Sequence, residues 1–145
     1  MTITDFLPGH TWVGGRLQSH VLRADEIVTE IEIPFRPTHS TYVKFALRKS
    51  WDFAIASAAV SAVIQDGIWN DVRIVLGGIA TFPLQEPRGG GSLRNRQISE
   101  AAAAEAAEAA LQLAKPLKMN GYKVELSKTL VRRALLSLDD QKTLN

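Results

Sequence analysis

Alternating apolar and polar residues predict strands in the first half of the chain. In residues 26–34, EIVTEIEIP, three isoleucines and a threonine share one face, while Val28 lies on the other face with two glutamates. This period of two is typical of a half-buried strand, here ended by a proline. Residues 41–49, TYVKFALRK, alternate in the same way and place Lys44 opposite the apolar face. A further strand is expected within residues 11–22.

The run AIASAAVSAVIQDG, residues 54–67, is compatible with either a helix or a strand. Alanine favours a helix, whereas the valines, the isoleucine and the following Asp66-Gly67 favour a strand that enters a hairpin turn. The β-rich run DVRIVLGGIA, residues 71–80, comes next. We therefore expect residues 54–65 to form a strand that pairs antiparallel with residues 71–80.

Helical patterns dominate the last third of the chain. Residues 99–114, SEAAAAEAAEAALQLA, begin with Ser99 as an N-cap, and Pro116 ends the helix. A second helix is expected over about residues 122–138, where apolar residues recur on one side. Residues 82–96, rich in proline and glycine, are predicted to be a loop.

The order of strands first and helices last predicts the fold class. It indicates an α+β domain, an antiparallel sheet of three to four strands packed on one face by two to three C-terminal helices. Small side chains allow two layers to approach closely. We therefore expect the Ala/Ser-rich strand to lie against the Ala-rich helix.

Composition narrows the function without defining it. The chain has 145 residues, enough for one domain, and no cysteine, which excludes disulfides, iron–sulfur clusters and a thiol nucleophile. The formal net charge of +2 is too small to indicate nucleic acid binding. No apolar stretch reaches about 18 residues and no signal peptide is visible, so we expect no membrane association. A cytoplasmic location is the simplest interpretation.

Metal and acid–base sites find little support. The three histidines lie in polar, turn-rich surroundings without metal-ligand spacing, so exposed loop histidines are the better interpretation and no metal is expected. Glu30 and Glu32 share a strand face, and a solvated outer face explains them better than a catalytic pair. The three histidines are His10, His20 and His39.

Two further patterns have a functional and a structural interpretation. RGGGSLRNR, residues 88–96, could cradle a phosphate through backbone N–H groups, but a flexible surface loop is the more frequent outcome. Residues 115–133 hold six basic residues and one acid, a pattern of nucleic acid binding or, more often, of a solvated helix face. We expect no nucleic acid partner.

Lys44 leaves two possibilities open. Its strand has a clean apolar face, and Lys44 lies on the opposite one with Tyr42 and Arg48. That face is either simply exposed or suited to an anionic ligand or a docked second domain.

Several motifs together resemble one known module. They are ADEIVTEIEIP, then YVKFALRKSWDFAIASAAVSAVIQDGIWNDVRIVLGGIATFP, and finally AKPLKMNGYKVELSKTLVRRAL. Together they resemble the C-terminal domain of the FAD-binding (medium) subunit of molybdenum hydroxylases, over about residues 22–138. The final stretch is most similar to the FAD subunits of bacterial aldehyde oxidoreductases and of xanthine dehydrogenases.

The resemblance implies a role in electron transfer. In this family FAD lies mainly in a preceding, larger domain, and the C-terminal domain closes over it. Val28 and Lys44 match the positions that contact the flavin. No catalytic residue is implied in this domain. The implied partners are iron–sulfur and molybdopterin subunits, with FAD taking electrons from the iron–sulfur centres.

The chain also departs from the family pattern. The flavin-binding motifs of the larger domain do not occur in residues 1–145, which we expect to form a single domain, and residues 1–21 resemble a remnant of the interdomain linker. FAD is therefore expected only with a separate flavin-binding domain. The family has a helix after ATFP, which Pro87 and three glycines are expected to abolish here.

A second interpretation belongs to a different functional class. The chain could be an independent, non-catalytic binding or assembly module that kept the fold without flavin and self-associates. In either case we expect Asp52 to hold the corner RKSWD, residues 48–52, through backbone or Arg48 contacts.

Overall fold

The computed structural model shows two compact units. The first comprises residues 1–36 with 80–82, and the second comprises residues 37–79 with 83–145. The residues that the structure describes are 1–7, 11–13, 16–36, 38–49 and 51–140. His10, one of the three histidines considered above, lies outside them.

The first unit contains little regular structure. Helix α1 (Ile3–Phe6) begins with a capping box, in which the hydroxyl of Thr2 accepts a hydrogen bond from the Asp5 amide at 3.2 Å. The single strand expected within residues 11–22 is instead a pair of antiparallel strands of three residues each. They are β1 (Thr11–Val13) and β2 (Arg16–Gln18).

The strand predicted at residues 26–34 is wrong for this structure. The segment is extended but pairs with no strand among the described residues. Ile27, Ile31 and Ile33 are 80–84% exposed. Alternation shows which side chains share a face, but a strand also needs a neighbour that satisfies its backbone groups. Within the described part of the chain, no neighbouring strand supplies these hydrogen bonds.

An antiparallel sheet forms the centre of the second unit. Its strands follow the order β3-β4-β5-β6, and β7 also pairs with β5. The β4–β5 hairpin is closed by Asp66 and Gly67, both with positive φ (51° and 74°), between the paired residues Gln65 and Ile68. The predicted antiparallel pair is thus confirmed, but its second strand is Ile68–Gly77 and not residues 71–80. The strands are β3 (His39–Phe45), β4 (Ala56–Gln65), β5 (Ile68–Gly77), β6 (Leu84–Gln85) and β7 (Arg96–Gln97).

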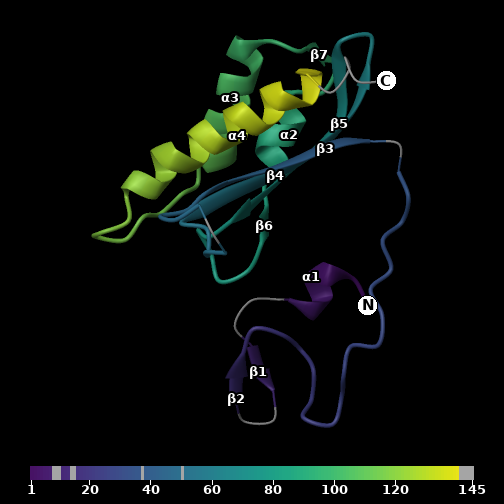
Figure 1. Ribbon diagram of the computed structural model, residues 1–145, viewed down its shortest axis with the longest axis vertical. Coiled ribbons are helices and arrows are strands. Elements are labelled where there is room, and N and C mark those ends of the chain that lie inside the picture. Colours follow the sequence, from purple (N-terminus) through teal and green to yellow (C-terminus); the bar gives the residue numbers. More distant parts are fainter. Residues whose placement is uncertain (8–10, 14–15, 37, 50, 141–145) are drawn as a thin grey trace. The chain divides into compact units, whose positions relative to one another are not determined.

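Three helices cover one face of this sheet (Figure 1). They are α2 (Pro87–Ser92), α3 (Glu100–Leu111) and α4 (Tyr122–Asp140). Ser99 caps α3, because its hydroxyl accepts from the Ala102 amide at 3.2 Å, as predicted. The α+β class, with an antiparallel sheet packed against C-terminal helices, is confirmed. Among the described helices, none has the length and apolarity needed to cross a membrane.

Helix α2 corrects the expectation that Pro87 and the glycines would abolish this helix. Pro87 stands in the first turn, where a proline is tolerated. Gly89 and Gly90 are buried between α3 and β5. A Cβ at Gly89 would lie 2.9 Å from the Cβ of Ala110, and one at Gly90 would overlap the carbonyl oxygen of Val72. Close packing outweighs the weak helix propensity of glycine.

The helix that lies against the Ala/Ser-rich strand β4 is α4, not the Ala-rich α3. Helix α3 packs mainly against α4 and α2. The fully buried Val131, Leu135 and Leu138 of α4 fill the space left by the small side chains of β4. The alanines of α3 in turn allow α2 to approach, since Gly89 meets the backbone of Ala106.

Candidate functional site

The sheet has a second face, on which none of the described helices of the second unit packs. In β4, Ala58 and Val60 belong to the buried core beneath the helices, so the alternate residues of each strand point the other way. Lys44 of β3 lies opposite Ser57 of β4. We call this surface the helix-free face. It comprises Ser40, Tyr42, Lys44, Ser57, Ala59, Ser61, Arg73, Val75 and Gly77.

The helix-free face is concave, with small side chains at its centre and larger ones at its margins. Small side chains of β4 form the floor, while Tyr42 and Arg73 rise on the neighbouring strands. Together they surround a hollow of about 560 Å³. At Gly77 an added Cβ would lie 2.5 Å from the Ser57 hydroxyl oxygen, so these two residues keep the floor flat. Such a shape suits a flat ligand or a docked domain.

Lys44 lies at one end of this face, beside a second hollow of about 450 Å³. Its ammonium group donates a hydrogen bond to the carbonyl oxygen of Asp52 at 3.0 Å. Two aromatic side chains next to it, Trp51 and Phe53, are almost fully exposed. The hollow is lined by Lys44, Lys49, Trp51, Asp52 and Phe53. It therefore combines ammonium groups with exposed aromatic rings.

The corner between β3 and β4 is organised by Asp52, as predicted. Its carboxylate accepts hydrogen bonds from Arg48 Nε at 3.1 Å and from the amide of Phe53 at 3.0 Å. The Arg48 hydrogen bond is the main cause that lowers the pKa of the Asp52 carboxyl below its usual value. A backbone hydrogen bond from Ile55 to Phe45, at 2.8 Å, closes the base of the corner.

The LGGIA motif has a structural role at the same end of the sheet. The ammonium group of Lys123, in the first turn of α4, donates to the carbonyl oxygen of Gly78 at 2.8 Å. A Cβ at Gly78 would lie within 3 Å of the carbonyl oxygens of Ala54 and Ile55. The turn after β5 is thus hydrogen-bonded to α4 and packs closely against the residues that precede β4.

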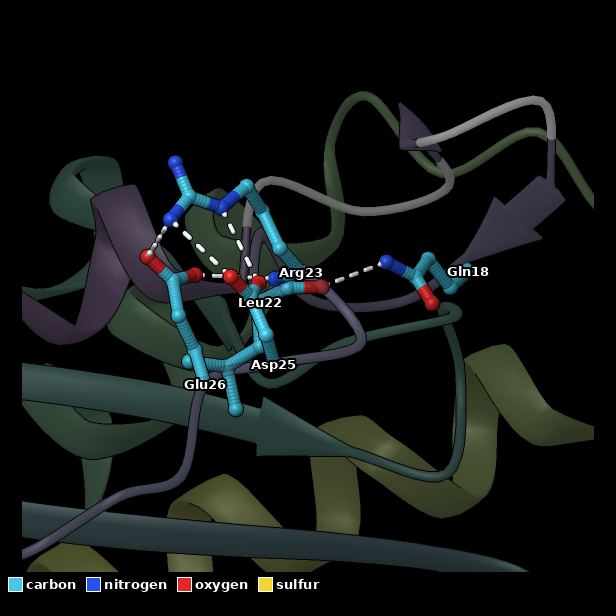
Figure 2. Close-up of polar contacts among 5 residues, drawn as sticks. All are labelled: Gln18, Leu22, Arg23, Asp25 and Glu26. Atoms are coloured by element: carbon cyan, nitrogen blue, oxygen red, sulfur yellow. Dashed lines mark hydrogen bonds and ion pairs between the residues drawn. The ribbon is translucent and has the colours of Figure 1, made fainter.

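Val28, the other predicted flavin contact, belongs to the first unit and is half-exposed. Val28 follows a polar turn formed around Arg23 (Figure 2). The amide of Arg23 donates to Glu26 Oε2 at 2.9 Å, and the guanidinium group of Arg23 donates to Asp25 at 3.2 Å. Val28 belongs to the first unit and Lys44 to the second unit. Their role as flavin contacts stays a prediction.

Other candidate sites are used for internal packing. In residues 88–96, the two buried glycines of α2 face α3 and β5, so they offer no phosphate cradle. Arg96, at the end of this segment, forms an ion pair with Glu105. On α4, Lys128 contacts Glu108 and Glu125, both at 2.8 Å. In the part of the chain that is described, no cluster of three or more metal-ligating side chains occurs.

Sequence reasoning missed the exposed aromatic residues at the Lys44 end of the face. Trp51 and Phe53 follow no periodic pattern, because they lie in a connection between two strands. The available signal was local: two aromatic residues in a charged, turn-forming segment, where burial is unusual.

The fold and the site define the class of protein. The chain belongs to the CO dehydrogenase flavoprotein C-terminal domain family, whose pattern matches residues 41–138. Its relatives are medium (FAD) subunits of molybdenum hydroxylases, as the sequence motifs predicted.

Particular relatives show how far the likeness extends. The chain is 34% identical over 119 residues to the nicotine 6-hydroxylase medium subunit of Paenarthrobacter nicotinovorans, covering 79% of this chain and 42% of that one. The crystal structure of quinoline 2-oxidoreductase from Pseudomonas putida 86 superimposes with a TM-score of 0.82 at 30% identity, covering 95% of this chain and 47% of that chain. Carbon monoxide dehydrogenase from Hydrogenophaga pseudoflava gives a TM-score of 0.62 at 29% identity, with coverages of 70% and 37%. The chain thus spans less than half of each relative.

Proposed function

We propose that this domain serves a molybdenum-containing hydroxylase or dehydrogenase, helping to cover FAD and to dock subunits during electron transfer. The observation that carries the proposal is the helix-free face, with a flat floor of small residues and the ammonium group of Lys44 held at its end. It occurs in a chain whose relatives are FAD subunits of such enzymes. No catalytic residue is assigned to the domain.

The groups at the Lys44 end fit a flavin chemically. An ammonium group has three donors, and only one of Lys44's is used by Asp52, so two remain for carbonyl or phosphate oxygens. The exposed rings of Trp51 and Phe53 offer apolar surface to a planar ring. We propose Lys44 as a polar contact and Val28 as an apolar contact. When bound, FAD supplies the electron relay between iron–sulfur centres and an acceptor.

The remaining parts of the site are proposed to come from a larger flavin-binding domain. Residues 1–145 supply one single domain of the flavoprotein, with residues 1–21 as the connecting segment. The expected partners are iron–sulfur and molybdopterin subunits. We further propose an enzyme of the aldehyde or xanthine oxidoreductase type, supported by a 30% identical stretch of 60 residues in the glyceraldehyde dehydrogenase medium chain of Sulfolobus acidocaldarius. A cytoplasmic location and no binding to nucleic acid complete the proposal.

Flavin absorbance tests this assignment directly. The purified chain is dialysed after incubation with FAD, and its absorbance near about 450 nm is recorded alone and with a flavin-binding domain of a medium subunit added. We expect flavin to be retained only in the second sample. Stoichiometric flavin on the chain alone would show that no second domain is needed, and no gain from the added domain would argue against the flavin role.

A second function is favoured by the exposed apolar segment of the first unit. Ile27, Ile31, Ile33 and Phe35 are 80–93% exposed, which is typical of a surface that another chain covers. The alternative proposal is therefore a non-catalytic binding or assembly module that self-associates. Light scattering over a range of concentrations separates the two, because a strict monomer at high concentration contradicts self-association.

A further inference from the structure

Asp52 contacts two basic side chains through two different parts of its structure. Its carboxylate receives Arg48, with Nε at 3.1 Å from Oδ2 and Nη2 at 3.4 Å from Oδ1. Its backbone carbonyl oxygen receives the Lys44 ammonium at 3.0 Å. The amide of Phe53 shares a planar peptide group with this carbonyl and donates to Oδ1 of the carboxylate at 3.0 Å, so the carboxylate and the carbonyl group are linked.

The segment that carries Asp52 needs such a restraint. The described residues between β3 and β4, 46–49 and 51–54, have no regular structure, and a hydrogen bond from Ile55 to Phe45 closes their base. The side chain of Asp52 is only 18% exposed, whereas that of Arg48 is 73% exposed. A lysine side chain loses rotamer entropy when it is held in one place, so the acceptor must be stationary for the contact to persist.

We propose that Asp52 is a positioning residue for Lys44, and that the Arg48–Asp52 ion pair keeps the Asp52 carbonyl in place. One donor of the Lys44 ammonium is then directed at the corner, and the other two stay available above the helix-free face. The functional meaning of this arrangement rests on the proposed flavin contact. The positioning itself is a property of this chain and can be measured without flavin.

Trace acetylation of lysines provides the test, with the rate at each lysine measured by mass spectrometry on the full chain. In Asp52→Asn and Arg48→Gln, the Lys44 rate should rise about two- to fivefold, the range expected when an exposed ion pair is lost. Arg48→Lys, which keeps a cation, should restore a rate closer to the original. Because Arg48 is exposed, its substitutions should not disturb folding, and they test the proposal even if Asp52→Asn folds poorly.

Lys123 is the matched control. It also donates to a backbone carbonyl, that of Gly78 at 2.8 Å, but lies at the start of α4 and outside residues 46–54. Its rate should not change in any of these variants. An unchanged Lys44 rate overturns the proposal, and so does an equal rise at Lys44 and Lys123, which would indicate general loosening.

Failure of this inference can be told apart from failure of the proposed function. If Lys44 labelling responds as expected but Lys44→Met leaves FAD retention unchanged in the combined sample, the positioning stands and the flavin contact does not. If Lys44→Met weakens FAD retention but labelling does not respond to Asp52 or Arg48, Lys44 contacts the flavin without this positioning.

Discussion

The side chain of Lys44 is oriented by the residues that surround it. In the sequence it is one charge on the outer side of a strand, and in the structure one of its donors is used by the Asp52 carbonyl. Trp51 and Phe53 add apolar surface beside it. The chemistry that can be read from this arrangement is the recognition of a planar group that bears oxygen acceptors.

Replacing Lys44 should weaken flavin binding without affecting the fold. We expect Lys44→Met to raise the FAD dissociation constant about tenfold in the sample with a flavin-binding domain, because a hydrogen bond from a charged donor is worth ~1.5 kcal/mol. Flavin fluorescence during titration measures this. Lys49→Met is the control, since Lys49 lines the same hollow but makes no hydrogen bond or ion pair with described residues. Equal effects in both variants would point to general electrostatics.

The Asp52 carboxyl should make stability depend on pH in the acidic range. The Arg48 hydrogen bond lowers its pKa in the folded state, so the unfolded state binds the proton first as pH falls. Its contribution is therefore complete above the unfolded pKa of about 3.9 and disappears as pH falls through the lowered folded value. Urea unfolding between pH 6 and about pH 3 should show a smaller decline in Arg48→Gln than in the original chain. A parallel decline would contradict the assignment.

Helix α2 shows at the level of elements that packing can override propensity. Six residues, PRGGGS, contain three glycines and still form a helix. Two of the glycines fill a space between α3 and β5 that no larger residue could enter. The third, Gly91, meets nothing within 4 Å. One short helix therefore contains both a position where glycine is required and one where it is not.

The two kinds of glycine should respond oppositely to alanine. Gly90→Ala should destabilise the chain by about 1–3 kcal/mol, because the added methyl group overlaps the rigid backbone at Val72. Gly91→Ala should stabilise it by about 0.5–1 kcal/mol through higher helix propensity. Chemical denaturation measures both. If Gly90→Ala were neutral, the close contact of α2 with β5 would be wrong.

At the level of the whole molecule, the described core residues all belong to the second unit. Among the residues whose burial the structure describes, the buried apolar residues of this core extend from Ala56 to Leu138. The family match over residues 41–138 covers the same region. The core and the family match therefore both lie within residues 37–145.

Residues 37–145 should consequently fold without the first unit. We expect this shortened chain to keep a cooperative thermal transition within about 2–4 °C of the full chain, since none of the described core residues is removed. Circular dichroism during heating measures the transition. A shortened chain that unfolds without cooperativity would show that residues 1–36 contribute to the core.

Prediction from sequence succeeded where local rules suffice. The Asp66-Gly67 turn, the cap at Ser99 and the strand 54–65 follow from the conformations that these residues favour. It failed for residues 26–34, because alternation does not specify a pairing partner. It also failed for α2, because the space around Gly90 is created by residues distant in the chain.

By itself the sequence determined the α+β class, the order of its long elements and the motifs of the medium-subunit family. These depend on periodicity, caps and turns, which act over a few neighbouring residues. Only the tertiary structure decided that α4 rather than α3 lies on β4, and that Lys44 is held by the carbonyl oxygen of Asp52. Both depend on how much space distant segments leave for one another, and no local pattern contains that information.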